Sequence, residues 1–295
     1  MGSGAEGGLF MVAAGLFVLL LCMEKLRPYK PVPTSSLRES FKTNASTFLV
    51  NNMVMNALSL SSLFVVAQRY GSHGLLHDWA NGPLKWAICF IFFDFLVYSW
   101  HFLGHKSELL WRLHKIHHSD KNIHVSTGLR FHLLDQLLEV AVKCCGVIAI
   151  GATAHVVVVC EITRMFFVFF HHANVAIPGE RWLSYVLITP NLHRVHHSAR
   201  RIEHDSNYGI VLSIWDMLFG TRKLLVPRKF GLEFVEAGNI LQLFSLAFIT
   251  EYSFARVLHH LPRVDERLDF ESAMIRQPSR AREVQKIEGV PRKIF

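Results

Sequence analysis

The sequence predicts an all-α, integral membrane helical bundle of about four spans, with a histidine-rich site for two metal ions. Of its 295 residues, 51% are hydrophobic and only 18% are charged. An ordinary soluble domain carries about 25% charged residues, so this balance favours a membrane protein. The 18 histidines are the second observation, because many of them recur at helical spacing.

Four apolar stretches account for the predicted spans. Residues 9–23 form the first run, which ends before three closely spaced prolines. Residues 48–67 form a second span, softened by asparagines and serines that should face other helices. Residues 84–100 form a third. Residues 135–170 are apolar over about 36 positions, which suits a helical hairpin better than one span.

The charges between these stretches predict their orientation. Segments 24–47 and 104–134 are rich in Lys and Arg, which is typical of cytoplasmic loops, whereas 68–83 holds one arginine. The net charge of +8 follows the flanks of apolar segments, so nucleic acid binding is not expected. The five cysteines lie in apolar runs without a C-x-x-C pair, which indicates structural thiols.

The chain is expected to have three parts. Residues 1–83 hold the N-terminal spans, and residues 84–225 hold the catalytic domain with its histidine boxes and membrane hairpin. Residues 226–295 form a mostly polar cytoplasmic tail, with a surface helix within 230–251 and a loosely held end from 262.

Three histidine boxes indicate the metal site. They are an H-x-x-x-H pair and two H-x-x-H-H triplets: His101 and His105, then His114, His117 and His118, then His193, His196 and His197. On a helix each triplet falls within an arc of roughly 100°, so its imidazoles should point the same way. Eight imidazoles exceed what one ion of four to six positions can take, so the sequence predicts two metals.

Other metal chemistries fit less well. A zinc hydrolase is disfavoured because the chain has no H-E-x-x-H motif. A bis-histidine haem electron carrier needs facing histidines within the membrane. A membrane metal transporter needs ligands near the bilayer midplane. The boxes instead cluster at one predicted membrane edge, where two irons would suit oxygen activation.

Further residues are expected to support the boxes. His172 ends a predicted span on the correct side and is a ninth candidate ligand, although the adjacent His171 is an alternative. His132 is either a supporting residue or a surface residue. Asp94 and Tyr98 share a helical stripe with the first box, so Asp94 either accepts a hydrogen bond from a ligand imidazole or makes an interhelical polar contact.

Seven motifs within residues 84–225 resemble the fatty acid hydroxylase superfamily, which includes sterol desaturases, fatty acid hydroxylases and alkylglycerol monooxygenase. They are DFLVYSWH at 94–101, LWRLHKIHHS at 110–119, GLRFH at 128–132, FHHAN at 170–174, TPNLHRVHHS at 189–198, DSNYG at 205–209 and WDMLFGT at 215–221. The chain departs from the family pattern at Phe102, where Arg is common, and at His204, where a small or aliphatic residue is frequent.

The resemblance implies a four-span di-iron oxygenase with a cytoplasmic helical cap. Such an enzyme uses O2 and two electrons to hydroxylate or desaturate a lipid, whether a sterol, an acyl chain or an ether lipid. The family's metal boxes match the eight histidines above, and His172 matches a further family histidine. Asp205, Asn207 and Tyr208 match family scaffold beside the third box.

The expected partners follow from that chemistry. The chain shows no fused cytochrome domain, so electrons should come from a separate cytochrome b-type protein, ferredoxin or reductase. Zinc is expected to replace iron in some preparations, since imidazole binds both. The membrane is expected to be a bacterial inner membrane or the endoplasmic reticulum, with the boxes on the cytoplasmic side.

Overall fold

The structure is a computed structural model that describes residues 2–57, 63–233, 235, 238–251 and 253–254. The chain divides into two units, Met1–Phe254 and Ala255–Phe295, and the description concerns the first. The loosely held end predicted from residue 262 lies outside the described residues. Within these residues the fold is helical, with isolated β-bridges and no strand. The predicted all-α class is therefore confirmed for the described chain.

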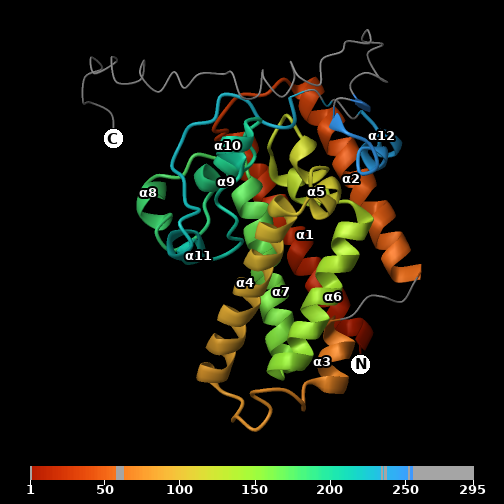
Figure 1. Cartoon of the computed structure of the whole chain (residues 1–295), viewed down its shortest axis with the longest axis vertical. Helices are drawn as coiled ribbons and strands as arrows, with labels where there is room; N and C mark the ends of the chain where they lie inside the picture. Colours follow the sequence, from red (N-terminus) through yellow and green to blue (C-terminus); the bar gives the residue numbers. More distant parts are fainter. Residues whose placement is uncertain (1, 58–62, 234, 236–237, 252, 255–295) are drawn as a thin grey trace. The chain divides into compact units, whose positions relative to one another are not determined.

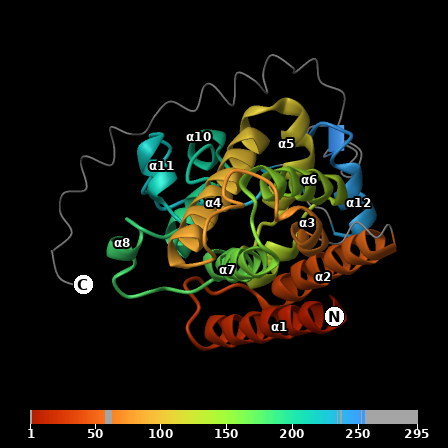
Figure 2. The same ribbon diagram turned by 90° about the horizontal axis from the view of Figure 1, so that it is seen from below.

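Five long helices run side by side along the unit (Figure 1). They are α1 (Gly2–Leu26), α2 (Thr34–Ala57), α4 (Pro83–Lys106), α6 (Leu133–Ile150) and α7 (Ala154–His172). The end-on view places α7 between α1 and α4, and it contacts both (Figure 2). A short helix, α3 (Leu63–Tyr70), packs against α6 and α7.

The hairpin predicted from the apolar run at 135–170 is formed by α6 and α7. Gly151 turns the chain between them with φ +75°, a left-handed conformation that favours glycine. A Cβ at this position would also collide with the carbonyl oxygen of His73. The 71–82 loop and this turn therefore meet at the same end of the bundle, where Leu75 N donates to Ala149 O.

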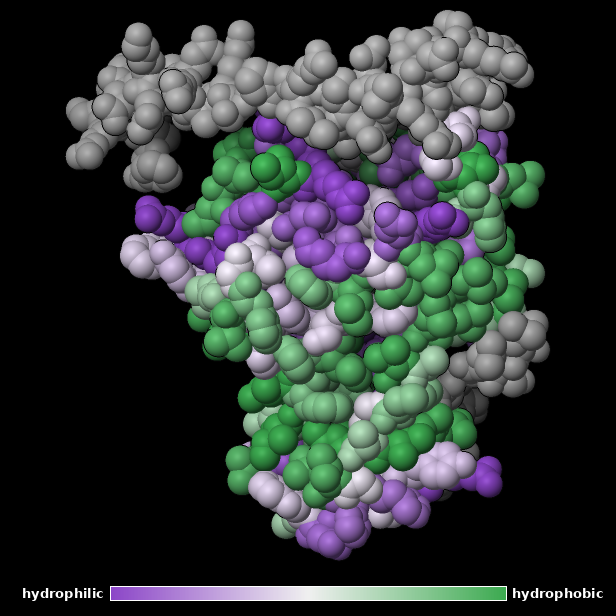
Figure 3. Space-filling model, in the orientation of Figure 1, coloured by the Kyte–Doolittle hydropathy of each residue, from purple (hydrophilic) through white to green (hydrophobic). Residues whose placement is uncertain are grey.

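Two helices, α4 and α7, are long and apolar enough to cross a membrane by length and composition. Large apolar side chains are exposed on this part of the unit, including Leu84 and Ile91 on α4, Leu138 on α6 and Val159 on α7. The surface accordingly shows apolar residues over the long helices and polar residues towards both ends (Figure 3). Such a belt is typical of a membrane protein.

The second predicted span, 48–67, falls on the second half of α2 and the start of α3, with residues 58–62 outside the described chain. Helix α2 begins earlier than the predicted span, at Thr34. Its asparagines contact loops of the site: Asn44 Nδ2 donates to Asp120 at 3.0 Å, and Asn51 Nδ2 donates to Phe131 O at 2.9 Å.

Short helices gather at one end of the long ones (Figure 1). They are α5 (Glu108–His114), η1 (His117–Ser119), η2 (Val125–Leu129), α8 (Glu180–Leu183), α9 (Pro190–His196), α10 (Arg201–His204), α11 (Ile214–Leu218) and α12 (Ile240–Ser245). In the described part of 230–251, where a surface helix was predicted, the structure has the six-residue helix α12. Ser107 ends α4 and caps α5 by accepting from Leu110 N, which brings the first two boxes together.

Candidate metal centre

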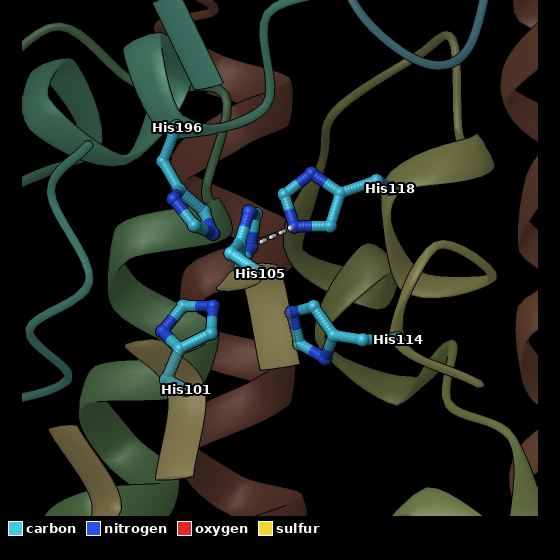
Figure 4. A group of neighbouring side chains, drawn as sticks. All are labelled: His101, His105, His114, His118 and His196. Carbon is cyan, nitrogen blue, oxygen red and sulfur yellow. Dashed lines mark hydrogen bonds between the residues drawn. The ribbon is translucent and has the colours of Figure 1, made fainter. Parts of the chain in front are cut away.

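The structure brings nine histidines into two buried groups. The five-histidine group comprises His101, His105, His114, His118 and His196, and the four-histidine group comprises His117, His172, His193 and His197. Within each group the ligand atoms lie within 4.8 Å of one another. Figure 4 shows the imidazoles of the five-histidine group converging from different parts of the chain. These are the eight box histidines and His172.

Each H-x-x-H-H triplet is divided between the two groups. In the second box His114 ends α5, whereas His117 and His118 lie in η1, so His117 faces the four-histidine group. The third box likewise sends His196 to one group and its other two histidines to the other. The prediction that each triplet points one way is wrong. In both boxes the histidines at i and i+4 share one group and the histidine at i+3 joins the other, because the two groups lie side by side, with ring centroids of His118 and His197 4.4 Å apart.

Backbone carbonyls fix which ring nitrogen carries the proton. His101 Nδ1 donates to Tyr208 O and His196 Nδ1 to Ser206 O, each at 2.7 Å. In the other group His117 Nδ1 donates to Arg130 O at 3.2 Å, and His172 Nδ1 donates to Val168 O at 2.6 Å. Since a carbonyl only accepts, the proton of each neutral ring is on Nδ1 and the lone pair of Nε2 points inward.

The Nε2 atoms of the four-histidine group converge on that of His172. His172 Nε2 lies 3.1 Å from His117 Nε2, 3.0 Å from His193 Nε2 and 3.2 Å from His197 Nε2. An ion about 2.1 Å from each nitrogen would place neighbouring ligand nitrogens roughly 3.0–3.4 Å apart. The spacing therefore fits a cation at the centre, and it leaves no room for a porphyrin between facing rings.

The five-histidine group also contains buried ring nitrogens that a cation could bind. The Nε2 atoms of His101, His114 and His196 are buried and have no hydrogen-bond partner among the described residues. A buried polar atom without a partner costs about 1–3 kcal/mol. His105 Nε2 and His118 Nε2 face each other at 3.1 Å. A second metal ion bound here would satisfy all five rings.

Burial keeps five of the box imidazoles neutral, the form that binds a metal ion. The pKa of each of these five histidines lies well below its usual range. Desolvation is the main cause, and the charge that neighbouring imidazoles would carry is the second. The five are His117, His118, His193, His196 and His197. Neutral imidazole is the form that ligates iron, zinc or copper.

Two carboxylates stand behind the five-histidine group. Asp135 Oδ2 accepts from His114 Nδ1 at 3.0 Å, and Asp205 Oδ1 lies 3.4 Å from His105 Nδ1. Such carboxylates orient a ligand imidazole and raise its basicity. Asp205 was expected near the third box, whereas Asp135 was not predicted. The available signal was a lone acid at the start of the apolar 135–170 run.

Asp94 and Tyr98 support the fold and contact no box imidazole by hydrogen bond among the described residues. Asp94 accepts from Val211 N and Leu212 N, both at 3.2 Å, and from Trp215 Nε1 at 2.8 Å. It lies seven residues before the first box histidine, about 10 Å along the helix, which is too far to reach that ring. The alternative of an interhelical polar contact is therefore the correct one. Tyr98 bonds to Thr221 Oγ1 at 3.2 Å.

His132 and His171 lie outside both groups. His132 caps α6 by accepting from Leu134 N at 3.2 Å, and its ring packs on Phe244. The structure thus gives it a role in the helix and not beside the metal. His171 packs its ring against His193 with centroids 3.8 Å apart, and His172 is the one of the two whose Nε2 joins a group.

The segment 205–209 supports the third box. Tyr208 is fully buried, and its ring packs edge-on against His101 while its carbonyl holds that ring's Nδ1. Asn207 has φ +55°, and its amide Nδ2 donates to Leu192 O at 2.9 Å. His204 lies beside this segment, where Nδ1 donates to Ser198 O at 3.0 Å. With His105 and Asp205 it forms a further small set of potential ligands.

A small cavity of about 40 Å³ touches both groups. Apolar side chains form part of its wall, among them Val97, Phe131, Val168 and Ile210. Phe131 stacks on His117 with ring centroids 4.3 Å apart. The cavity therefore joins the candidate metal ligands to an apolar surface on the long helices.

A charged network borders this cavity. Lys143 Nζ lies 3.1 Å from Glu139 and 3.0 Å from Glu161, and Arg164 pairs with Glu161 at 3.1 Å and with Glu139 at 3.5 Å. The sequence spacing predicts the pairs within each helix, and the structure also links them across the hairpin. Four charges that compensate one another lower the cost of burial between apolar helices.

Comparison with known proteins agrees with the motifs. Residues 86–221 match the family model described as fatty acid hydroxylase. These residues include all three histidine boxes, so the match agrees with the resemblance that the boxes indicate.

Two relatives are hydroxylating enzymes by name. The chain is 30% identical over 213 residues to an ornithine lipid hydroxylase of Rhizobium tropici, covering 69% of this chain and 63% of the relative. It is 28% identical over 213 residues to the alkylglycerol monooxygenase of Homo sapiens, covering 71% of this chain and 46% of the relative. The match thus spans less than two thirds of either relative. No solved structure is matched.

Proposed function

We propose that this chain is a membrane-bound di-iron oxygenase that hydroxylates a lipid. The observation that carries the proposal is the pair of buried histidine groups, whose Nε2 lone pairs converge at spacings that suit a metal ion. The nine histidines would hold two irons, five around one and four around the other. Zinc would bind the same imidazoles in preparations that lack iron.

The reaction consumes one C–H bond, O2, two electrons and two protons, and it yields an alcohol and water. The irons supply the O2 chemistry when they are bound. The protein's part is to hold the imidazoles in their tautomers, with Asp135 and Asp205 behind two of them. Val97, Val168 and Ile210 would admit a hydrocarbon chain to the cavity and exclude water.

The substrate class follows from the relatives. The two named relatives are an ornithine lipid hydroxylase and an alkylglycerol monooxygenase, which supports hydroxylation of a lipid over desaturation of a sterol. Desaturation is the alternative outcome of the same chemistry. A separate electron donor would deliver the electrons.

The same proposal includes a membrane arrangement. We infer about four spans, with α4 and α7 supported by their apolar composition and the histidine groups on the cytoplasmic side. The division into residues 1–83, 84–225 and 226–295 belongs to this proposal. A cysteine-labelling scan of the 71–82 loop against the 107–132 segment in intact cells would test the orientation. Labelling of both from the outside would contradict it.

Isotope labelling tests the function. Lipids of a host that expresses the chain under ¹⁸O2 would be compared with those of a host that expresses His118→Ala. We expect a lipid that gains one labelled oxygen only with the native chain. A labelled lipid of equal amount in both hosts, or metal uptake without any oxygenated lipid, would refute the assignment.

A further inference from the structure

A second pocket, larger than the cavity between the histidine groups, opens on the polar end of the unit. Its volume is about 330 Å³, and we call it the basic pocket. Among the described residues its wall holds four exposed basic side chains, Lys30, Lys121, Arg228 and Lys229, and one acid, Glu233. Lys30, Arg228 and Lys229 alone outnumber the acid, and this excess of positive charge favours an anionic partner.

One wall of the basic pocket is pressed onto the third histidine box. Residues 228–232, which we call the strap, run along the end of the third box. Ala199 N donates to Lys229 O at 2.9 Å, and Gly231 N donates to His197 O at 3.2 Å. Phe230 pairs with Ser198 in an isolated β-bridge. The strap is thus one hydrogen bond away from a member of the four-histidine group.

The strap also reaches the loop that follows the second box. Gly231 has φ +83°, and a Cβ there would lie 2.9 Å from Lys121 Cγ and 3.1 Å from Asp120 O. Glycine therefore allows both a left-handed turn and a close approach. The basic pocket touches the segments after both triplets, although it is separate from the cavity beside the imidazoles.

The proposed reaction requires an external reductant. Two electrons must reach a metal centre whose imidazole ligands are buried. A path that includes a hydrogen bond transfers electrons faster than the same distance through space. The path from the pocket wall runs from Gly231 N–H to His197 O and then through the bonds of His197 to its ring. The pocket thus combines a charged surface with a short route to the metal ligands.

We propose that the basic pocket docks the acidic face of a one-electron carrier protein, which reduces the metal centre through the Gly231–His197 hydrogen bond. This inference rests on the proposed function. Two reduced carriers are each oxidised by one electron per turnover, and these electrons, with two protons and O2, convert the lipid C–H to C–OH and water. Attraction between opposite charges mainly accelerates such encounters and weakens as salt is added.

Binding of an acidic haem carrier tests the docking. The probe is the soluble haem domain of cytochrome b5, and its Kd is measured for the full chain in detergent, both metal-free and iron-loaded, at low and high salt. Arg228→Glu should raise the Kd about tenfold at low salt, with the difference largely lost at high salt. The matched control is Arg69→Glu on α3, an equal charge change at an exposed site outside the pocket, which should shift the Kd less than about twofold.

The electron route has its own readout. The rate at which reduced probe is oxidised anaerobically by the iron-loaded chain should fall about tenfold in Gly231→Ala, measured at saturating probe and equal iron content. Reduction of the same iron by dithionite, which needs no docking, should change much less. If Gly231→Ala loses iron, the Arg228→Glu series decides the proposal alone.

Three results would overturn the inference. They are equal Kd values for Arg228→Glu and the native chain, equal effects of Arg228→Glu and Arg69→Glu, or displacement of the probe by inorganic phosphate at an ionic strength where chloride has no effect. The last result would identify a small-anion site instead. Failure of the lipid oxidation itself would be seen separately, because probe binding to the metal-free chain does not depend on turnover.

Discussion

The five-histidine group and the four-histidine group differ in the atoms behind their imidazoles. In the first, carboxylates of Asp135 and Asp205 stand behind His114 and His105, in addition to the carbonyls that hold the other two rings described above. In the second, backbone carbonyls hold His117 and His172. A carboxylate makes a ligand imidazole more basic than a carbonyl does. The two metal positions should therefore be unequal, with the ion in the five-histidine group held more strongly.

The largest expected effect comes from removing one ligand of either group. His105→Ala and His172→Ala should each lower turnover to below about one hundredth of the native rate, a larger loss than supporting residues usually cause. Metal analysis of the purified variants should show one equivalent lost. Two equivalents retained together with native turnover would contradict the assignment of the groups.

Removing a supporting carboxylate should affect one group only. Asp135→Asn should weaken metal binding in the five-histidine group by about 10–100-fold, because His114 loses its negatively charged partner. Competition with a chelator of known affinity measures this change. Asp94→Asn is the control, since its carboxylate bonds to Trp215 and backbone N–H groups. It should lower thermal stability and leave metal affinity unchanged.

The inequality should also appear in the order of metal loss. During slow chelation the four-histidine group should release its ion first, because it offers one imidazole fewer and no carboxylate behind a ligand in the described chain. The native protein should therefore lose metal in two phases. His172→Ala should lack the faster phase. A single phase in the native chain would show that the ions are equivalent or leave together.

The smallest effect is expected at His132, which lies near Asp135 but belongs to neither group. His132→Ala removes a helix cap and should cost about 1 kcal/mol. The apparent melting temperature should fall by about 2–4 °C. Metal content should stay at two equivalents, and a loss of metal would place this histidine in the site after all.

The spacing of histidines predicted which imidazoles come together better than how they are arranged. Periodicity selected the eight box histidines, and the structure gathers all eight in two buried groups. It did not predict how they divide, because that depends on how η1 and α9 are placed against each other in the folded chain. This placement is set by tertiary contacts that spacing does not contain.

Hydropathy predicted the hairpin and the apolar belt, but not the role of α2. The asparagines of α2 resemble those of a polar membrane helix, and only the folded chain shows that Asn44 and Asn51 bind Asp120 and Phe131 O. Asp135 was missed for a similar reason. Its role depends on α6 packing beside α5, which brings together His114 and Asp135, 21 residues apart in the sequence.

The division of each triplet between the groups has a consequence for how the protein matures. Both η1 and α9 carry histidines of the two groups, so an ion bound in one group would also help to order ligands of the other. Binding of metal to partly ordered ligands releases free energy that folds the segments carrying them. Iron supply would then set the lifetime of the protein in a cell as well as its activity, since a bound ion would hold together the segments on which nine imidazoles converge.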